Sequence, residues 1–131
     1  IDLNLIDLIG TTAELTSADA VLEVGTGTGS LTARLVKEAG QIVSIEIDTA
    51  FAPVARQVVG ERENVKYLQG DCLAKKSELN PAMLKAWDAA ARKPGITTRK
   101  LVANLPYVIA MPLISNLLCS DIPIERMVVM V

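Results

Sequence analysis

A glycine-rich loop directly after a short apolar segment constrains the fold of this 131-residue chain more than any other feature. The apolar segment, residues 20–24, ends at the alternating glycines of residues 25–29 (GTGTG). Apolar residues from Leu31 onward then recur at helical spacing, and the predicted helix ends at Gly40. A strand, a glycine turn and a helix in this order are typical of the first unit of a βαβ fold. Glycines at such a turn let the backbone bend sharply and let a ligand approach closely.

The remaining sequence continues this alternation of short apolar and longer amphipathic segments. We expect strands at residues 20–24, 41–47, 65–68, 99–103 and 127–131. We expect helices at residues 2 to about 14, 31–40, 49–59 and 108–118. The long stretch 72–98 is predicted to be a helix with flanking loops, bounded by Pro81 and Pro94. A composition that is 50% hydrophobic but only 3% aromatic suits a parallel sheet covered by helices on both faces. The sequence therefore predicts one α/β domain over residues 1–131, with a mostly parallel sheet.

The chain ends and the cysteines suggest a setting. The chain opens with Ile1 and stops at Val131 inside an apolar run, so we expect a piece of a longer protein, truncated after the fifth strand. No run approaches the roughly 20 apolar residues of a membrane span. Cys72 and Cys119 have no histidine to join in a metal site, and two free thiols fit a reducing compartment. We expect a cytoplasmic monomer with no metal and no membrane partner.

Charge is unevenly distributed along the chain. The net charge of −2 alone argues against a nucleic-acid binder. Residues 71–103, however, carry seven cations against three acids, so this basic segment is +4 and the remainder is −6. The basic segment can be a phosphate-facing patch or a solvated helix surface, and the sequence leaves both open.

The glycine spacing separates three classes of ligand site. A dinucleotide fingerprint needs Gly-x-Gly-x-x-Gly, but its last position here is Ser30. A phosphate loop needs Gly-Lys-Ser/Thr, which does not occur. Alternating glycines two residues after an acid, Glu23, resemble motif I of S-adenosylmethionine-dependent methyltransferases. The alternative is a glycine turn without a ligand.

Acidic residues follow the next two predicted strands. Glu46 ends the second strand and can accept hydrogen bonds from both hydroxyls of a ribose. Asp48 is expected to cap the following helix. Asp71 follows the third strand and can accept from the exocyclic amine of an adenine. Because parallel strands end at one edge of a sheet, these acids are expected near the glycine loop.

The tetrapeptide Asn104-Leu105-Pro106-Tyr107 follows the fourth predicted strand. An adenine amine is planar and poorly nucleophilic because its lone pair is conjugated with the ring. Two acceptors on its hydrogens, the Asn104 side-chain oxygen and the Pro106 carbonyl, would localise that lone pair. Tyr107 would stack on an extruded base. The alternative is a strand-end turn with Tyr107 in the core.

In this combination the chain resembles the ribosomal RNA adenine N6,N6-dimethyltransferases, which modify adenosines near the 3′ end of small-subunit RNA. The likeness begins at residues 2–7 (DLNLID), which are similar to the family's first helix. Residues 23–29, Glu46, Gly70-Asp71 and residues 104–107 match its motifs I to IV in order.

The resemblance implies a Rossmann-like methyltransferase domain that uses S-adenosylmethionine and acts on ribosomal RNA in the small ribosomal subunit. It implies that the donor is bound by Glu23, Gly25, Gly27, Gly29, Glu46, Asp71 and Asn104. It implies that the target adenine is held by Asn104, Pro106 and Tyr107. The family's N-terminal lid segment and C-terminal helical domain are expected outside these 131 residues, and the stretch between Asp71 and Asn104 is longer than the family usually has.

Other substrates and roles remain open from the motifs alone. Large-subunit RNA, DNA or a protein glutamine would present the same planar amine. A ribosome-assembly or transcription factor with this fold but no methylation is a different class, which the intact motifs disfavour. A nicotinamide dehydrogenase is disfavoured by the glycine spacing.

Overall fold

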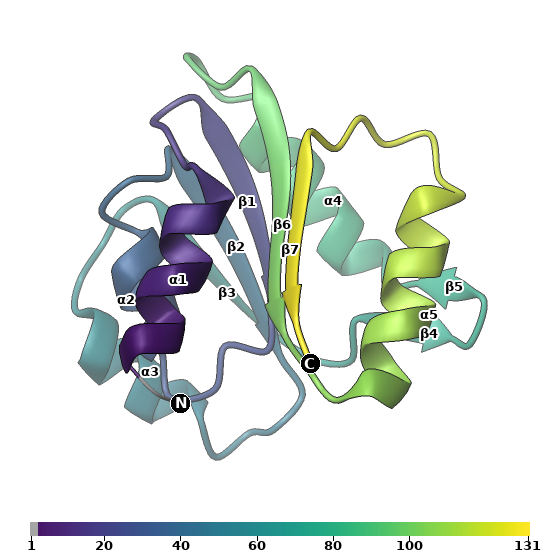
Figure 1. Ribbon diagram of the computed structural model, residues 1–131, viewed down its shortest axis with the longest axis horizontal. Coiled ribbons are helices and arrows are strands. Elements are labelled where there is room, and N and C mark those ends of the chain that lie inside the picture. Colours follow the sequence, from purple (N-terminus) through teal and green to yellow (C-terminus); the bar gives the residue numbers. More distant parts are fainter. Residues whose placement is uncertain (1–2) are drawn as a thin grey trace.

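A five-stranded parallel sheet forms the centre of the protein in a computed structural model that describes residues 3–131 (Figure 1). Its strands are β1 (Asp19–Val24), β2 (Gln41–Glu46), β3 (Val65–Gln69), β6 (Thr98–Asn104) and β7 (Arg126–Met130). They lie side by side in the order β3-β2-β1-β6-β7, and every neighbouring pair is parallel. All five carboxyl ends therefore meet at one edge of the sheet, and this edge holds the predicted site.

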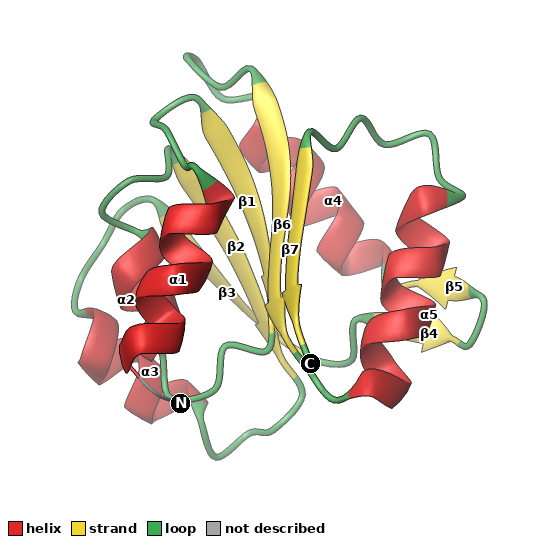
Figure 2. Cartoon of the chain, in the orientation of Figure 1, coloured by secondary structure: helices red, strands yellow, loops and turns green. Residues whose placement is uncertain are grey.

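Helices cover both faces of this sheet. They are α1 (Leu3–Ala13), α2 (Ser30–Leu35), α3 (Ala52–Val59), α4 (Pro81–Ala91) and α5 (Tyr107–Leu118). Figure 2 shows α1, α2 and α3 on one face and α4 and α5 on the other. Among the described residues no helix has the length and apolarity that crossing a bilayer requires.

Alternating side chains of the strands supply a core on each face. On β1, Val21 packs into the core with α1 and α2, whereas Leu22 packs into the core with α4 and α5. Buried on both faces, the central strands read as near-continuous aliphatic runs, which is why composition alone indicated a parallel sheet. The predicted α/β fold, with a mostly parallel sheet between two helix layers, is confirmed.

The stretch 72–98 contains more structure than predicted. Its expected helix is α4, which starts at Pro81 and is capped by the side chain of Asn80. Before it, β4 (Leu73–Lys75) and β5 (Glu78–Leu79) form a small antiparallel hairpin, which we call the β4–β5 hairpin. The sequence did not indicate this hairpin because its strands are very short and its turn contains neither glycine nor asparagine.

Two helix boundaries also differ clearly from the prediction. Helix α2 ends at Leu35, well before Gly40. Gly40 is instead a point of close approach, since a Cβ there would lie 2.1 Å from the Ser17 carbonyl oxygen. Helix α3 begins at Ala52. The Asp48 carboxylate accepts the Ala50 N–H at 2.9 Å in the turn before this helix, so the prediction that Asp48 caps the helix is wrong. Residue 2 of the first predicted helix lies outside the described residues.

Candidate functional site

The predicted motifs converge where the chain changes direction across the sheet. From β1 the chain proceeds through β2 to β3 on one side, then crosses to β6 on the other side of β1. The loops after β1 and β6 therefore diverge at the carboxyl edge, which is where open α/β sheets bind ligands. Residues 25–29 and 104–107 are these two loops, and residues 25–28 of the first and 104–106 of the second line one pocket together.

Two glycines of the first loop shape this pocket. Gly25 has φ 91°, and a Cβ on it would lie 3.0 Å from the Asn104 carbonyl oxygen and 3.3 Å from Leu105 Cδ2. Its N–H donates to the Ile45 carbonyl at 2.9 Å, so it joins the ends of three strands. Gly27 has φ 55° and open space where a Cβ would be. A left-handed backbone at both positions favours glycine, and the missing side chains leave room beside the strand ends.

Gly29 serves the fold and does not line the pocket. Its φ is 88°, and a Cβ would lie 2.9 Å from Ala55 Cα. The glycine therefore allows the start of α2 to approach α3 closely. This differs from the expectation that all three glycines of the loop face the ligand.

Glu46 connects the second strand end to the glycine loop. Its Oε1 accepts the Gly27 N–H at 2.7 Å, and its Oε2 accepts the Asp48 N–H at 3.0 Å. The carboxylate is thus held at the pocket wall by two backbone donors. Each of its oxygens keeps acceptor capacity for a hydroxyl of a bound ligand.

Glu23, in contrast, lies beneath the loop. Its side chain is fully buried and accepts hydrogen bonds from the hydroxyls of Thr32 and Ser44 on Oε1. Its Oε2 is buried without a hydrogen-bond partner among the described residues. Burial raises the pKa of Glu23 to about 7; the two hydroxyls oppose this rise and the charge of Glu46 adds to it. The expectation that Glu23 touches the donor therefore differs from its position, which supports the loop from below.

This buried acid predicts a dependence of stability on pH. Because the pKa of Glu23 is about 7 in the folded chain and 4.5 ordinarily, the folded state binds the proton more tightly. The contribution of Glu23 to the free energy of unfolding is then complete below the ordinary pKa and is lost as pH rises through 7, which amounts to a fall of about 3 kcal/mol. In Glu23→Gln this fall is expected to be absent, as measured by urea unfolding at pH 5 and pH 8. The exposed Glu63→Gln should retain it, and an unchanged fall in Glu23→Gln would contradict the assignment.

Two adjoining pockets follow the carboxyl edge. The larger, about 400 Å³, lies between the two diverging loops and within the range of small-ligand sites, about 300–1,000 Å³. The smaller, about 50 Å³, continues toward Gly70 and Asp71 at the end of β3. Gly25, Glu46, Ile47, Leu105 and Ile109 line both. The site is therefore one elongated space that runs from the glycine loop to Asp71.

The inner end of this space is apolar apart from Asp71. Cys72 lines it as a buried free thiol, and burial together with the Asp71 charge raises its pKa to about 11. Asp71 Oδ1 accepts the Leu73 N–H at 3.0 Å, which fixes the carboxylate at the pocket wall. A flat apolar group with one polar edge matches this combination of walls.

The tetrapeptide 104–107 projects from the sheet into solvent. Asn104 is the last residue of β6, and Leu105 is anchored by donating its N–H to the Met130 carbonyl at 3.0 Å. Tyr107 opens α5 with 65% of its surface exposed. The alternative of Tyr107 as a core residue is therefore excluded. A core tyrosine would be buried, whereas this ring is free to meet a ligand.

The Pro106 carbonyl is engaged in the first turn of α5. It accepts the N–H groups of Ile109 and Ala110, each at 3.0 Å. The Leu105 carbonyl accepts no hydrogen bond from any residue that the structure describes. The free backbone acceptor beside Asn104 is thus one residue earlier than the sequence suggested. The sequence did not reveal that Leu105 supplies this acceptor, because the start of α5 could not be placed to the residue. Pro106 is the N-cap of α5, and its carbonyl accepts the first hydrogen bonds of that helix.

Sequence reasoning also missed the apolar residues of the site. Ile47 and Phe51 follow Glu46 and line the larger pocket, and 60% of the Ile47 surface is exposed. A large apolar residue between two acids just beyond a strand end was the available signal. Such a residue can only be placed against a ligand once the loop's path is known.

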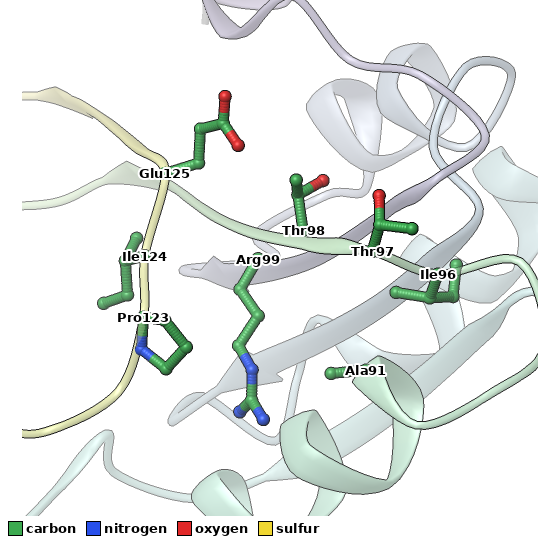
Figure 3. A pocket seen from close by; sticks show the side chains of 8 residues that line it. All are labelled: Ala91, Ile96, Thr97, Thr98, Arg99, Pro123, Ile124 and Glu125. Carbon is green, nitrogen blue, oxygen red and sulfur yellow. The ribbon is translucent and has the colours of Figure 1, made fainter.

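A separate pocket lies at the opposite edge of the sheet. It occupies about 440 Å³ between the amino ends of β6 and β7 and the end of α4 (Figure 3). Its cation, Arg99, is held by Asp88 at 2.8 Å and lies over the Trp87 ring. None of the predicted motif residues reaches this pocket. Over the described part of the chain, no group of three or more His, Cys, Asp or Glu residues could hold a metal ion.

Comparison with known proteins gives a family match over the full chain. The family model described as "Ribosomal RNA adenine dimethylase" matches residues 1–131. The chain is 39% identical over 131 residues to a "Ribosomal RNA small subunit methyltransferase A" of Pelotomaculum thermopropionicum, and 40% identical over 129 residues to that of Ligilactobacillus salivarius. These alignments cover 100% and 98% of this chain but only 43% and 41% of the two relatives.

Solved structures agree with this result. A dimethyladenosine transferase from Plasmodium falciparum superposes with a TM-score of 0.74 at 25% identity, over 98% of this chain and 41% of that one. The 23S rRNA methyltransferase ErmE superposes with a TM-score of 0.72 at 29% identity, over 98% of this chain and 46% of that one. The fold described above is therefore shared with a dimethyladenosine transferase and a 23S rRNA methyltransferase.

Proposed function

The chain belongs to the ribosomal RNA adenine dimethylase family, and from this premise we propose that the protein dimethylates the N6 amine of adenosines in small-subunit ribosomal RNA. The methyl donor is S-adenosylmethionine. The observation that carries the proposal is the pocket of about 400 Å³ that the glycine loop after β1 shares with Asn104, Leu105 and Pro106 of the loop after β6. A ribosomal substrate implies a cytoplasmic protein whose partner is the small ribosomal subunit.

The residues that line the two pockets fit this donor. Gly25 and Gly27 leave space for its amino-acid tail, and Glu46 can accept from its ribose hydroxyls. Asp71 and the apolar inner pocket suit its adenine ring. Gly29 and Glu23 act indirectly, since they hold the glycine loop in place and do not line the pockets. When bound, the donor supplies a methyl group that is carried by a cationic sulfonium. The neutral sulfide that remains after transfer is a good leaving group.

The loop after β6 receives the target adenine. The Asn104 side-chain oxygen and the Leu105 carbonyl are the two acceptors for the hydrogens of the N6 amine, because the Pro106 carbonyl is already bonded to two helix N–H groups. Pro106 fixes the turn between these acceptors and α5. Tyr107 offers its exposed ring as a stacking surface for a base taken out of its helix.

Catalysis in this arrangement consists of orientation and electrostatics. Two acceptors on the amine draw its nitrogen toward tetrahedral geometry and concentrate the lone pair in the direction of the donor pocket. Holding both reactants in line replaces an encounter in solution with a pre-oriented one. The acceptor dipoles also stabilise the positive charge that develops on the nitrogen. This scheme needs no histidine, and the chain contains none.

Large-subunit RNA is the alternative substrate that a specific observation supports. The solved 23S rRNA methyltransferase ErmE superposes nearly as well as the dimethyladenosine transferase. The relatives that are 39% and 40% identical carry small-subunit names, which favours the small subunit.

The test uses the full-length protein, labelled S-adenosylmethionine and ribosomal subunits that lack these methyl groups. We expect label in small-subunit RNA, recovered as N6,N6-dimethyladenosine after digestion. Label in large-subunit RNA or in protein would refute the substrate assignment. Calorimetric titration with S-adenosylmethionine and with NAD tests the donor separately, and tighter binding of NAD would refute the methyltransferase assignment.

A further inference from the structure

The basic segment noted in the sequence separates into two parts in space. Arg99 and Arg92 both pair with Asp88 at 2.8 Å, and Lys100 pairs with Asp19 at 2.9 Å. Three of the seven cations of this segment are therefore ion-paired.

Four cations of this segment, Lys75, Lys76, Lys85 and Lys93, form no ion pair among residues 3–131, and of these only Lys75 and Lys76 are adjacent in sequence. Both of these adjacent lysines are exposed at the turn of the β4–β5 hairpin. Glu78 on the same hairpin leaves it a net charge of +1. Two adjacent unpaired lysines at a turn are placed to meet a phosphate backbone.

The hairpin lies beside the helix that begins at the proposed catalytic loop. Asn116 of α5 donates its side-chain N–H to the Lys76 carbonyl at 3.3 Å, and Figure 1 shows the hairpin next to α5. Tyr107 is the first residue of α5, and Asn116 is nine positions further along. At about 1.5 Å per residue, the two are roughly 14 Å apart along the helix. Nine positions at 3.6 residues per turn also place the two side chains on opposite sides of α5, so a strand that joins them crosses the helix and spans at least about four stacked nucleotides.

The surface between these two points is suited to unpaired bases. The exposed side of α5 carries Val108, exposed over 77% of its surface, and Met111, which follow Tyr107 in the first two turns. Beyond them, a groove of about 430 Å³ opens between the hairpin, the start of α4 and the end of α5. Leu79 and Leu84 give this groove apolar walls, while Ser77, Glu78 and Asn116 place hydrogen-bonding groups at it.

We propose that this surface, from Val108 along α5 to Lys75 and Lys76, binds the single-stranded RNA that flanks the target adenosine. The inference rests on the proposed function, since the strand must enter at Tyr107. Bases lie against the apolar side of α5 and its groove, and Lys75 and Lys76 contact phosphates at least about four nucleotides from the target. The Glu78 carboxylate can accept from a base amine in the groove. An RNA strand fits better than a protein partner because apolar contacts lead to unpaired cations at its end.

The experiment compares two double variants of the full-length protein. Lys75→Ala/Lys76→Ala removes the hairpin cations. Arg92→Ala/Lys93→Ala removes an equal charge from the same segment at the end of α4, where Lys93 contacts Gln41 at the opposite edge of the sheet. Binding of unmodified small-subunit RNA is measured from 50 to 300 mM salt, and donor binding confirms that each variant is folded. The hairpin variant is expected to bind about tenfold more weakly at 0.15 M salt, with a salt slope reduced by about 1.4.

The control variant is expected to bind RNA like the unaltered protein. Equal affinity and slope in both variants would overturn the proposal. So would protection of Lys75 and Lys76 from acetylation before RNA is added, because another part of the protein would then cover the surface. Methyl transfer by the unaltered protein is measured on the same RNA within small subunits. Absence of transfer there refutes the proposed function, whereas transfer with an unaffected hairpin variant refutes only this inference.

Discussion

Replacement of Asn104 by alanine is expected to lower methyl transfer at least about a thousandfold while donor binding remains measurable. In the proposed site Asn104 supplies the one side-chain acceptor for the target amine, and loss of a preoriented group that stabilises developing charge costs about 10²–10³ in turnover. Here the lone pair also becomes less localised, so the effect is at the upper end or beyond it. The Asn104 side chain is exposed at the end of β6, so its loss leaves the core unchanged. Single-turnover transfer and calorimetric donor titration measure the two effects separately.

A conservative variant distinguishes this role from a structural one. Asn104→Asp keeps an acceptor oxygen in the same position and should retain at least about tenfold more activity than Asn104→Ala. Both variants should unfold at the same urea concentration as the unaltered protein. Turnover by Asn104→Ala that equals the unaltered rate would remove the residue from the mechanism. Equal losses in both variants would show that the amide N–H, and not the oxygen, matters.

The sheet was predictable because its strands are short, aliphatic and separated by helical segments. Residues 20–24 and 101–103 are buried and, apart from Glu23, apolar, so they cannot be mistaken for half-exposed strands. The polar motifs after them then marked the carboxyl edge. What remained hidden was the β4–β5 hairpin, whose five strand residues carry no period-2 pattern long enough to recognise.

The site was predictable to the level of loops but not of atoms. Motif spacing correctly brought residues 25–29, Glu46, Asp71 and residues 104–107 to one edge. It could not tell which loop residues face the ligand. Gly29 and Glu23 belong to the same motif as Gly25. Gly29, however, allows α3 to pack closely against the loop, and Glu23 lies beneath the loop. Such roles depend on tertiary neighbours such as Ala55 and Ser44, which are distant in sequence.

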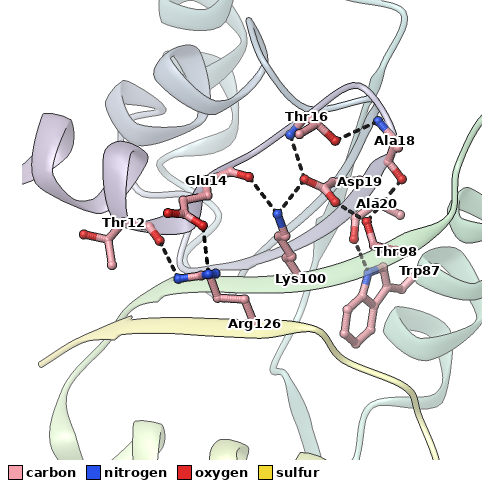
Figure 4. Close-up of polar contacts among 10 residues, drawn as sticks. All are labelled: Thr12, Glu14, Thr16, Ala18, Asp19, Ala20, Trp87, Thr98, Lys100 and Arg126. Carbon is pink, nitrogen blue, oxygen red and sulfur yellow. Dashed lines mark hydrogen bonds and ion pairs between the residues drawn. The ribbon is translucent and has the colours of Figure 1, made fainter.

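The opposite edge of the sheet holds a buried ion pair that fastens β1 to β6 (Figure 4). Lys100 Nζ lies 2.9 Å from Asp19 Oδ2 and donates to the Glu14 carbonyl at 2.7 Å. Asp19 is 1% exposed, and its carboxylate also accepts from the Thr98 hydroxyl and the Thr16 N–H. The two charged side chains themselves are almost removed from water, with 8% of the Lys100 side chain and 2% of the Asp19 side chain exposed.

Loss of one partner of this pair is expected to be among the most destabilising single changes in the chain. Lys100→Met keeps the apolar stem but leaves the Asp19 carboxylate buried without its counter-ion, which should cost about 3–5 kcal/mol of unfolding free energy. Arg126→Met is the matched control. Its partner at the same edge, Glu14, is largely exposed, so breaking that pair should cost less than about 1 kcal/mol. Urea unfolding at pH 7 measures both.

Two further measurements identify the unpaired Asp19 charge as the cause of the stability loss in Lys100→Met: the pH dependence of that loss and its response to a second substitution. Burial opposes ionisation of Asp19, but the hydrogen bonds from Thr98, Lys100 and Thr16 together with the Lys100 charge lower its pKa. A lowered pKa contributes stability that is present above the ordinary value of 3.8 and is lost as pH falls through the folded value. The deficit of Lys100→Met should narrow as pH falls, because the buried Asp19 carboxylate, once it has lost the Lys100 charge, takes up a proton at a higher pH than the paired carboxylate does. Asp19→Asn in the same chain as Lys100→Met should recover part of the loss at pH 7, because no buried charge is then left unpaired. A deficit that is constant with pH and unrelieved in the double variant would assign it to packing of the Lys100 stem.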